Sequence, residues 1–193
     1  VARVFNAVRA GAMGFRKPVA IKQILPHVAQ NEHVVQSLIN EARVGAYLEH
    51  RNIAEVHEFD QVGETWYLAM ELVRGLTVGQ MLARSQPRGG LPVHLVTEIG
   101  VQACDGLAYA HDACDELDRP LKLIHRDLKP SNVMVRYGGV VKVMDFGIAK
   151  ATSNLFLTAH GQTKGTPAYM SPEQVQGESL DRRSDLFSLA SLL

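Results

Sequence analysis

The chain has 193 residues, of which 46% are hydrophobic and 21% charged, and its 20 Lys and Arg residues balance its 20 Asp and Glu residues. This composition is typical of a globular protein with one domain or two small lobes. Zero net charge provides no basic field for nucleic acid, two cysteines are too few for a disulfide framework, and no apolar run approaches the ~18 residues that cross a bilayer. We therefore expect no nucleic-acid partner and, for this segment, a cytoplasmic location.

The first part of the chain, to about residue 73, combines short β-like runs with one helical pattern. Gly-containing turns separate the runs, and apolar residues spaced by three and four predict a helix over about residues 33–49. The β-like runs are Val1–Ala10, Val19–Ile24, Ile53–Phe59 and Trp66–Leu72. A few strands with one helix predict a small antiparallel α+β lobe.

After Val73 the pattern becomes mainly helical. The spacing of apolar residues predicts a short helix over residues 75–84 and a long one over 93–115. Two β-like runs at 132–136 and 140–144 flank Tyr137-Gly138-Gly139, a sequence that favours a hairpin. Residues 145–173 show no regular periodicity, and irregular segments of this length are usually functional.

Four local motifs occur in a fixed order. They are Val19-Ala20-Ile21-Lys22 in a β-like run, Glu41 in the first helix, His125-Arg126-Asp127-Leu128-Lys129-Pro130-Ser131-Asn132 before the hairpin, and Asp145-Phe146-Gly147 after it. Gly165-Thr166-Pro167-Ala168-Tyr169-Met170-Ser171-Pro172-Glu173 closes the irregular segment. On these motifs the chain resembles the eukaryotic-type Ser/Thr protein kinases, most closely the bacterial branch, over essentially its whole length.

The resemblance implies an α+β, two-lobe protein-kinase-like fold that is incomplete at both ends. It implies a small antiparallel N-lobe at residues 1–73 and part of a larger, mainly helical C-lobe at residues 74–193. Ala2 stands where the family has the third glycine of its phosphate loop, so the start of that loop is expected before Val1. We expect a segment of a longer protein that exposes an apolar patch and that, alone, is marginally stable and weakly active. A membrane anchor elsewhere in the parent protein is left open.

The expected activity is transfer of the ATP γ-phosphate to Ser or Thr hydroxyls of protein substrates. Such transfer needs positioning and charge compensation more than covalent help. By resemblance, Lys22 contacts the α- and β-phosphates and pairs with Glu41 on the facing helix. Asp127 is expected to accept or orient the proton of the acceptor hydroxyl, and Lys129 to reach the transferred phosphate. Lys129 together with Thr166 is typical of Ser/Thr rather than Tyr specificity.

The expected cofactors are ATP and Mg²⁺. Asn132 and Asp145 flank the predicted hairpin, which brings their side chains to one edge, and hard oxygen ligands suit Mg²⁺. By resemblance these two residues hold the metal. Taken singly, an Asn or Asp beside a strand is more often a turn former.

Adenine recognition is expected where the two lobes join. By resemblance, Met70 is the gatekeeper, the Glu71 carbonyl and the Val73 N–H contact the base, and an apolar sandwich encloses the ring. The sandwich residues are Val4, Ala20 and Met134. An ordinary apolar edge strand would explain this hydrophobicity equally well.

Regulation is expected at Arg126, which in the family pairs with a phosphate on the irregular segment. A phosphate on Thr158 or Thr163, added by a second copy of the kinase, would order that segment against the arginine. The residues alone do not choose between the two threonines.

Two other functions compete with a protein kinase. A nucleotide-binding pseudokinase scaffold is disfavoured because it has no need of the full set of Lys22, Glu41, Asp127, Asn132 and Asp145. A small-molecule kinase is disfavoured by the segment 165–173, which in the family forms a platform for peptide substrates.

Overall fold

The computed structural model describes residues 2–25, 32–146 and 167–193, without the side chains of residues 32–34, 37, 38 and 41. The strands are β1 (Ala2–Ala10), β2 (Arg16–Ile24), β3 (Val56–Val62), β4 (Thr65–Glu71), β5 (Gly75–Thr77), β6 (Val133–Arg136) and β7 (Val141–Val143). The α-helices are α2 (Glu32–Gly45), α3 (Val78–Ser85), α4 (Val93–His111), α5 (Pro172–Gln176) and α6 (Arg182–Leu192). No helix within these ranges is both long and apolar enough to cross a membrane.

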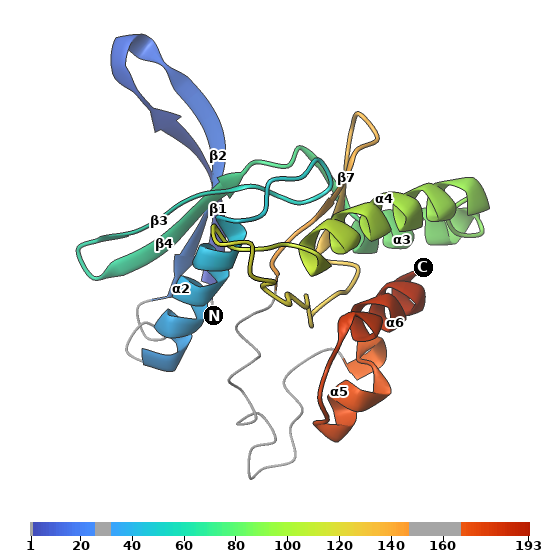
Figure 1. Ribbon diagram of the computed structural model, residues 1–193. Coiled ribbons are helices and arrows are strands. Elements are labelled where there is room, and N and C mark those ends of the chain that lie inside the picture. The colour runs from blue at the N-terminus through green and yellow to red at the C-terminus, as the bar shows by residue number, and fades with distance from the viewer. Residues whose placement is uncertain (1, 26–31, 147–166) are drawn as a thin grey trace.

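The first sheet has the strand order β1-β2-β4-β3, with all neighbours antiparallel. Its register sets Val4 opposite Lys22 and Ala20 opposite Met70. Directly opposed residues of antiparallel strands share a face, so these side chains lie on one face of the sheet. Helix α2 lies beside this sheet (Figure 1), and its Ala42 belongs to a buried cluster with Ala20 and Met70.

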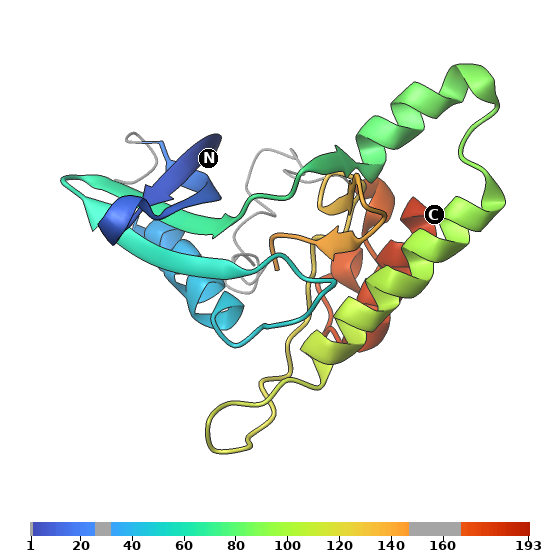
Figure 2. The same ribbon diagram turned by 90° about the horizontal axis from the view of Figure 1, so that it is seen from above.

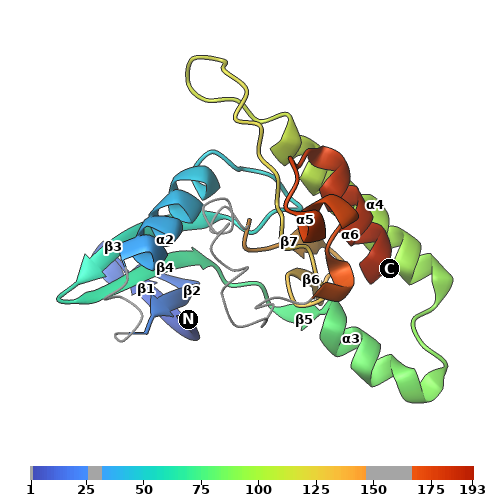
Figure 3. The same cartoon turned by 90° about the horizontal axis from the view of Figure 1, so that it is seen from below.

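The second part of the molecule is built around α4. The small sheet β5-β6-β7 and helix α6 pack against this helix (Figure 3). Ala103, Leu107 and Ala110 are completely buried there because they recur at three- and four-residue steps along one helix face. Val133 and Val143 of the sheet complete this core.

The structure corrects several predicted boundaries. Strand β2 begins at Arg16 rather than residue 19, because β1 pairs with it along its whole length. Strand β3 begins at Val56 rather than residue 53, because Ile53 turns away to form a parallel bridge with Val143 of the other sheet.

The predicted helix at 75–84 begins only at Val78, after a short strand that the sequence did not indicate. Thr77 accepts a hydrogen bond from the Gln80 N–H, and the Gln80 side chain accepts one from the Thr77 N–H, a capping box that starts the helix. Gly75 pairs with Arg136 of β6 so closely that a Cβ there would lie 2.0 Å from the Val135 carbonyl oxygen. Only glycine fits this close approach of the two strands.

In the connection from α4 to β6, the loop at residues 113–121 projects from the rest of the molecule (Figure 2) and is held by its own hydrogen bonds. The Leu121 N–H donates to the Ala113 carbonyl at 2.9 Å and closes the base of the loop. Inside, the Asp115 carboxylate accepts hydrogen bonds from the backbone N–H groups of Leu117 and Arg119 and from the Arg119 guanidinium. The hydrogen bonds from Arg119 hold the pKa of Asp115 below its usual value.

Candidate active site

Lys22 and Asp145 meet across the two lobes. Lys22 lies on β2, Asp145 follows β7, and the Lys22 Nζ lies 3.0 Å from the Asp145 Oδ1. The backbone of Asp145 has φ 56°, in the left-handed region that costs a non-glycine residue free energy. Its neighbour Met144 packs against the N-lobe core and donates its N–H to the Asn132 carbonyl at 2.9 Å. These contacts hold the unusual backbone that presents Asp145 to Lys22.

A second cluster surrounds Asp127. The Lys129 Nζ lies 2.8 Å from the Asp127 Oδ2. The Asn132 Nδ2 donates to the Asp127 backbone carbonyl at 2.9 Å and lies 3.3 Å from its Oδ2. The structure therefore brings together Asp127, Lys129 and Asn132, three residues that the sequence predicted for one site.

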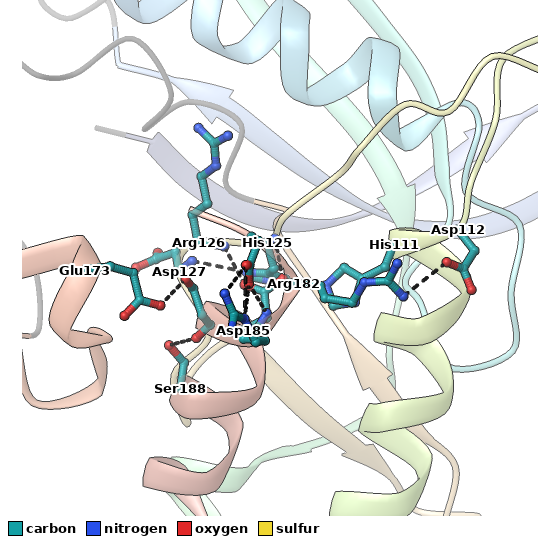
Figure 4. A network of polar contacts seen from close by, with 12 residues as sticks. His111, Asp112, His125, Arg126, Asp127, Glu173, Arg182, Asp185 and Ser188 are labelled. Carbon is teal, nitrogen blue, oxygen red and sulfur yellow. Dashed lines mark hydrogen bonds and ion pairs between the residues drawn. The ribbon is translucent and has the colours of Figure 1, made fainter. Parts of the chain in front are cut away.

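The carboxylate of Asp185 on α6 supports the backbone beside this cluster. It accepts the N–H of His125 at 2.8 Å, the N–H of Arg126 at 2.9 Å and a hydrogen bond from the His111 Nε2 at 2.8 Å (Figure 4). Burial alone would raise the pKa of Asp185, but the hydrogen bonds from His111 and from the backbone N–H groups of His125 and Arg126 together lower it. Asp185 therefore braces the backbone of the loop that carries Asp127.

His125 is a packing residue. Its ring is completely buried and lies 4.7 Å from the Phe146 ring, centroid to centroid. Its Nε2 donates to the Met144 carbonyl at 2.9 Å, and its Nδ1 accepts from the Asp127 N–H at 3.3 Å, so both nitrogens are used by the neutral form. Burial lowers the pKa of His125. It therefore orders the loop rather than transferring protons.

Arg126 combines a strained backbone with an unpaired nitrogen. Its φ is 65°, and its buried Nε has no hydrogen-bond partner among the described residues. The side chain points away from Asp185 (Figure 4). Its carbonyl accepts a hydrogen bond from the Gln174 Nε2 at 2.8 Å, which ties α5 to this loop.

The residues expected around adenine fall into three places. Ala20 and Met70 are opposed on β2 and β4 and are buried, and Val73 is buried just beyond β4. Val4 shares the Lys22 face of the sheet and is 66% exposed. Met134 lies on β6, in the other sheet.

The sequence predicted that the Glu71 carbonyl contacts adenine. It did not reveal that the Glu71 side-chain carboxylate forms ion pairs with two basic residues. Its Oε2 lies 2.8 Å from the Nζ of Lys142 on β7, and its Oε1 lies 3.4 Å from a guanidinium nitrogen of Arg136. The Lys142 Nζ also donates to the Ile53 carbonyl at 3.0 Å. A lysine between two valines in a three-residue strand was the available signal, but alternation would have placed it in solvent.

His111 was also missed as a supporting residue. It stands four residues after Leu107, so it continues the buried stripe of α4 to the end of that helix. That spacing was the signal that distinguished it from the scattered surface histidines.

Some predicted site residues lie outside the described part of the chain. The backbone of Glu41 is helical within α2, but its side chain is among those left out, and Thr158, Thr163 and Thr166 fall in the undescribed residues 147–166. Among the described residues, no three His, Cys, Asp or Glu side chains gather into a metal cage. Asn132 and Asp145 still offer the oxygen donors that suit Mg²⁺ when phosphate and water oxygens complete its shell.

Comparison with known proteins places these features in a family. The sequence matches the protein kinase domain over residues 2–193. It is 40% identical over 190 residues to the tyrosine-protein kinase MasK of Myxococcus xanthus, covering 98% of this chain and 29% of MasK. It is 36% identical over 177 residues to the serine/threonine-protein kinase PknL of Mycobacterium tuberculosis, covering 92% of this chain and 42% of PknL.

Comparison with solved structures also finds protein kinase domains. The crystal structure of the PknI kinase domain of Mycobacterium tuberculosis superposes with a TM-score of 0.67 at 28% sequence identity. That match covers 93% of this chain and 63% of the PknI chain, so the sequence spans less than two thirds of a solved kinase domain. With the family matched over nearly every residue and the lobes joined at Lys22 and Asp145, this chain belongs to the protein kinase family and has its two-lobe fold.

Proposed function

We propose that this chain carries the catalytic residues of an ATP-dependent protein Ser/Thr kinase. The observation that supports this proposal is the 3.0 Å contact between Lys22 of one lobe and Asp145 of the other. Such a contact brings a cation and a carboxylate oxygen to one place, where a metal–triphosphate needs both. Protein substrates follow from the family.

Each residue has a distinct task in this proposal. Lys22 binds the α- and β-phosphates, and Asn132 and Asp145 hold Mg²⁺. Asp127 accepts or orients the proton of the acceptor hydroxyl, and Lys129 offers positive charge beside it. Bound Mg-ATP would supply the phosphoryl group and neutralise part of its charge. The hinge segment 70–73 offers its backbone groups to adenine.

Ser/Thr acceptors are favoured by Lys129, whose ammonium lies 2.8 Å from the Asp127 carboxylate. The similarity to MasK, which is named a tyrosine kinase, makes the acceptor a question for experiment. Acid hydrolysis of the labelled product and separation of its phosphoamino acids should give phosphoserine or phosphothreonine. Phosphotyrosine alone would refute the Ser/Thr assignment and leave the kinase assignment intact.

The catalytic proposal is tested by incubating the purified protein with Mg-ATP labelled at the γ-phosphate. We expect Asp127→Asn to lower the transfer rate by about 10²- to 10⁴-fold, because the amide cannot accept the hydroxyl proton. Asp105→Asn, the same change on an exposed face of α4, should leave the rate unchanged. Nucleotide binding with no transfer by the unmodified protein would instead support the pseudokinase scaffold.

For regulation, we propose that a phosphate on Thr158 or Thr163 binds Arg126. Its buried Nε, without a partner among the described residues, supports an anion at this place. A second copy of the protein would add the phosphate through transient self-association. Thr158→Ala together with Thr163→Ala should remove the concentration-dependent rise in activity during preincubation with ATP, and a rise that persists would refute this mechanism.

A further inference from the structure

The first strands of the chain carry an unbalanced charge. Residues 1–31 contain five Lys and Arg residues and no Asp or Glu, although the whole chain is neutral. Of these cations, Arg9, Arg16 and Lys17 lie at the outer end of the β1–β2 hairpin, and all three are exposed. Among these basic residues only Lys22 is assigned to the active site, so the presence of Arg9, Arg16 and Lys17 at the outer end of the hairpin requires another explanation.

The end of this hairpin is an ordered apolar tip, residues 11–15. The Gly11 N–H donates to the Phe15 carbonyl at 2.8 Å, and the Phe15 N–H donates to the Ala12 carbonyl at 3.1 Å. Met13 has φ 56° and is 104% exposed, and Phe15 is 59% exposed. Figure 1 shows this tip projecting beyond the rest of the sheet. Two large apolar side chains are therefore held in solvent by a hydrogen-bonded turn.

The cations surround the apolar tip on both faces of the hairpin. Arg9 is opposite Lys17, and Ala10 is opposite Arg16. Opposed residues share a face and successive residues alternate, so Arg9 and Lys17 lie on one face and Arg16 on the other. Arg9 lies 3.9 Å from Glu58 and its side chain keeps 56% exposure, so this contact leaves most of it accessible.

We propose that the apolar tip inserts into the surface of a bilayer that contains anionic phospholipids. A convex tip of Met13 and Phe15 can enter a deformable acyl layer, whereas a protein partner would need a matching hollow. Cations on both faces of the hairpin can contact headgroups all around an inserted tip, whereas a protein partner would contact one face. Apolar side chains beside Lys and Arg are the usual combination for interfacial membrane binding.

The neighbouring β3–β4 hairpin provides a matched control within the same sheet. Its tip carries Val62, which is 68% exposed, and the charged residues two positions away on either side are the acidic Asp60 and Glu64. An exposed apolar side chain between acidic residues should be repelled from an anionic surface. Val62→Asp therefore makes the same chemical change at a tip that we expect to stay in water.

The test is sedimentation of the purified protein with vesicles, without nucleotide, so that it is independent of the kinase proposal. The vesicles contain phosphatidylcholine alone or equal parts of phosphatidylcholine and phosphatidylglycerol. We expect binding to the anionic vesicles only. Arg16→Gln with Lys17→Gln should weaken the partition coefficient about 25-fold, because each cation near an anionic surface contributes about fivefold.

The apolar contribution is tested separately. Met13→Asp with Phe15→Asp should abolish binding, Phe15→Trp should retain it, and Val62→Asp should leave it unchanged. Brominated lipid should quench the fluorescence of the Phe15→Trp variant more than that of the unmodified protein, since the new indole enters the acyl layer.

Three results would overturn the proposal. They are no binding to anionic vesicles at low ionic strength, binding that the Asp double variant does not reduce, and equal affinity for soluble polyglutamate. The last result would indicate an acidic protein as the partner of a purely electrostatic site.

Discussion

A single carboxylate, Asp185, satisfies donors from two separate segments. It is 1% exposed and accepts the N–H groups of His125 and Arg126 as well as the His111 ring N–H. In Asp185→Asn one acceptor oxygen becomes an amide donor, which faces another donor. We expect a loss of about 2 kcal/mol in the free energy of unfolding, the usual scale for hydrogen bonds to a charged group, and a large fall in transfer rate. Urea denaturation and phosphate labelling measure these effects.

Asp181→Asn is the matched control for that change. Asp181 caps the same helix by accepting the Arg183 N–H, and asparagine caps helices about as well as aspartate. The control should therefore lose little stability. Equal losses in the two variants would show that Asp185 has no special bracing role.

The protonation of His125 predicts how stability depends on pH. Because burial lowers the pKa of His125 in the folded state, only the unfolded chain takes up a proton as the pH falls through the ordinary histidine pKa of 6.5. The stabilising contribution of neutral His125 is thus complete above that pH and decreases below it. Asp185, whose folded pKa lies below its ordinary 3.8, adds a further loss only in stronger acid.

We therefore expect Tm to fall between pH 7 and pH 5, and His125→Phe to reduce that slope while keeping a ring beside Phe146. Thermal melts across this range are the measurement. His94→Gln, a change on the exposed start of α4, should keep the original slope. An unchanged slope in His125→Phe would contradict the assignment.

At the scale of elements, Lys142 connects three of them. Lys142 lies on β7, and its Nζ contacts the Glu71 carboxylate at the end of β4. The same Nζ donates a hydrogen bond to the carbonyl of Ile53, which precedes β3. In Lys142→Met the Glu71 carboxylate keeps the Arg136 guanidinium and the Glu55 N–H but loses its shortest ion pair. We expect a loss of about 2 kcal/mol, less than for a fully buried pair because the Glu71 side chain is 18% exposed. The KM for ATP should rise more than kcat falls, because Glu71 lies in the expected adenine hinge.

The double variant Lys142→Met with Glu71→Gln also removes the negative charge of Glu71, which the single variant leaves without its lysine. It should recover part of the stability that the single variant loses, as measured by urea denaturation. If the double variant is less stable by the sum of both single losses, the two side chains do not act as a pair.

Sequence reasoning succeeded where local motifs indicate the fold and failed where packing depends on the register between distant strands. The motif order predicted the two-lobe fold, because the residues of each motif are neighbours in the chain. Strand β5 and the network of Lys142 depend on pairing between segments far apart in the chain, which local periodicity does not encode. The roles of the remaining site residues stay predictions.

At the scale of the whole molecule, large apolar side chains are exposed on both α5 and α6. Val175 is 60% exposed, Leu186 45% and Phe187 44%. Exposed large apolar groups promote association, so we expect the 193-residue chain to bind a hydrophobic dye and to scatter light at high concentration. Val175→Ser with Phe187→Ser should reduce both signals without lowering Tm. Dye binding that stays constant in this variant would place the apolar surface elsewhere.

The loop at 113–121 has a practical consequence. Its two ends are joined by the hydrogen bond between Leu121 and Ala113, and its tip residue Leu117 is 70% exposed. Chain inserted at such a tip need not disturb the scaffold that carries it. A fluorescent reporter or an affinity epitope could therefore be inserted beside Leu117, which would label the protein at an internal surface position.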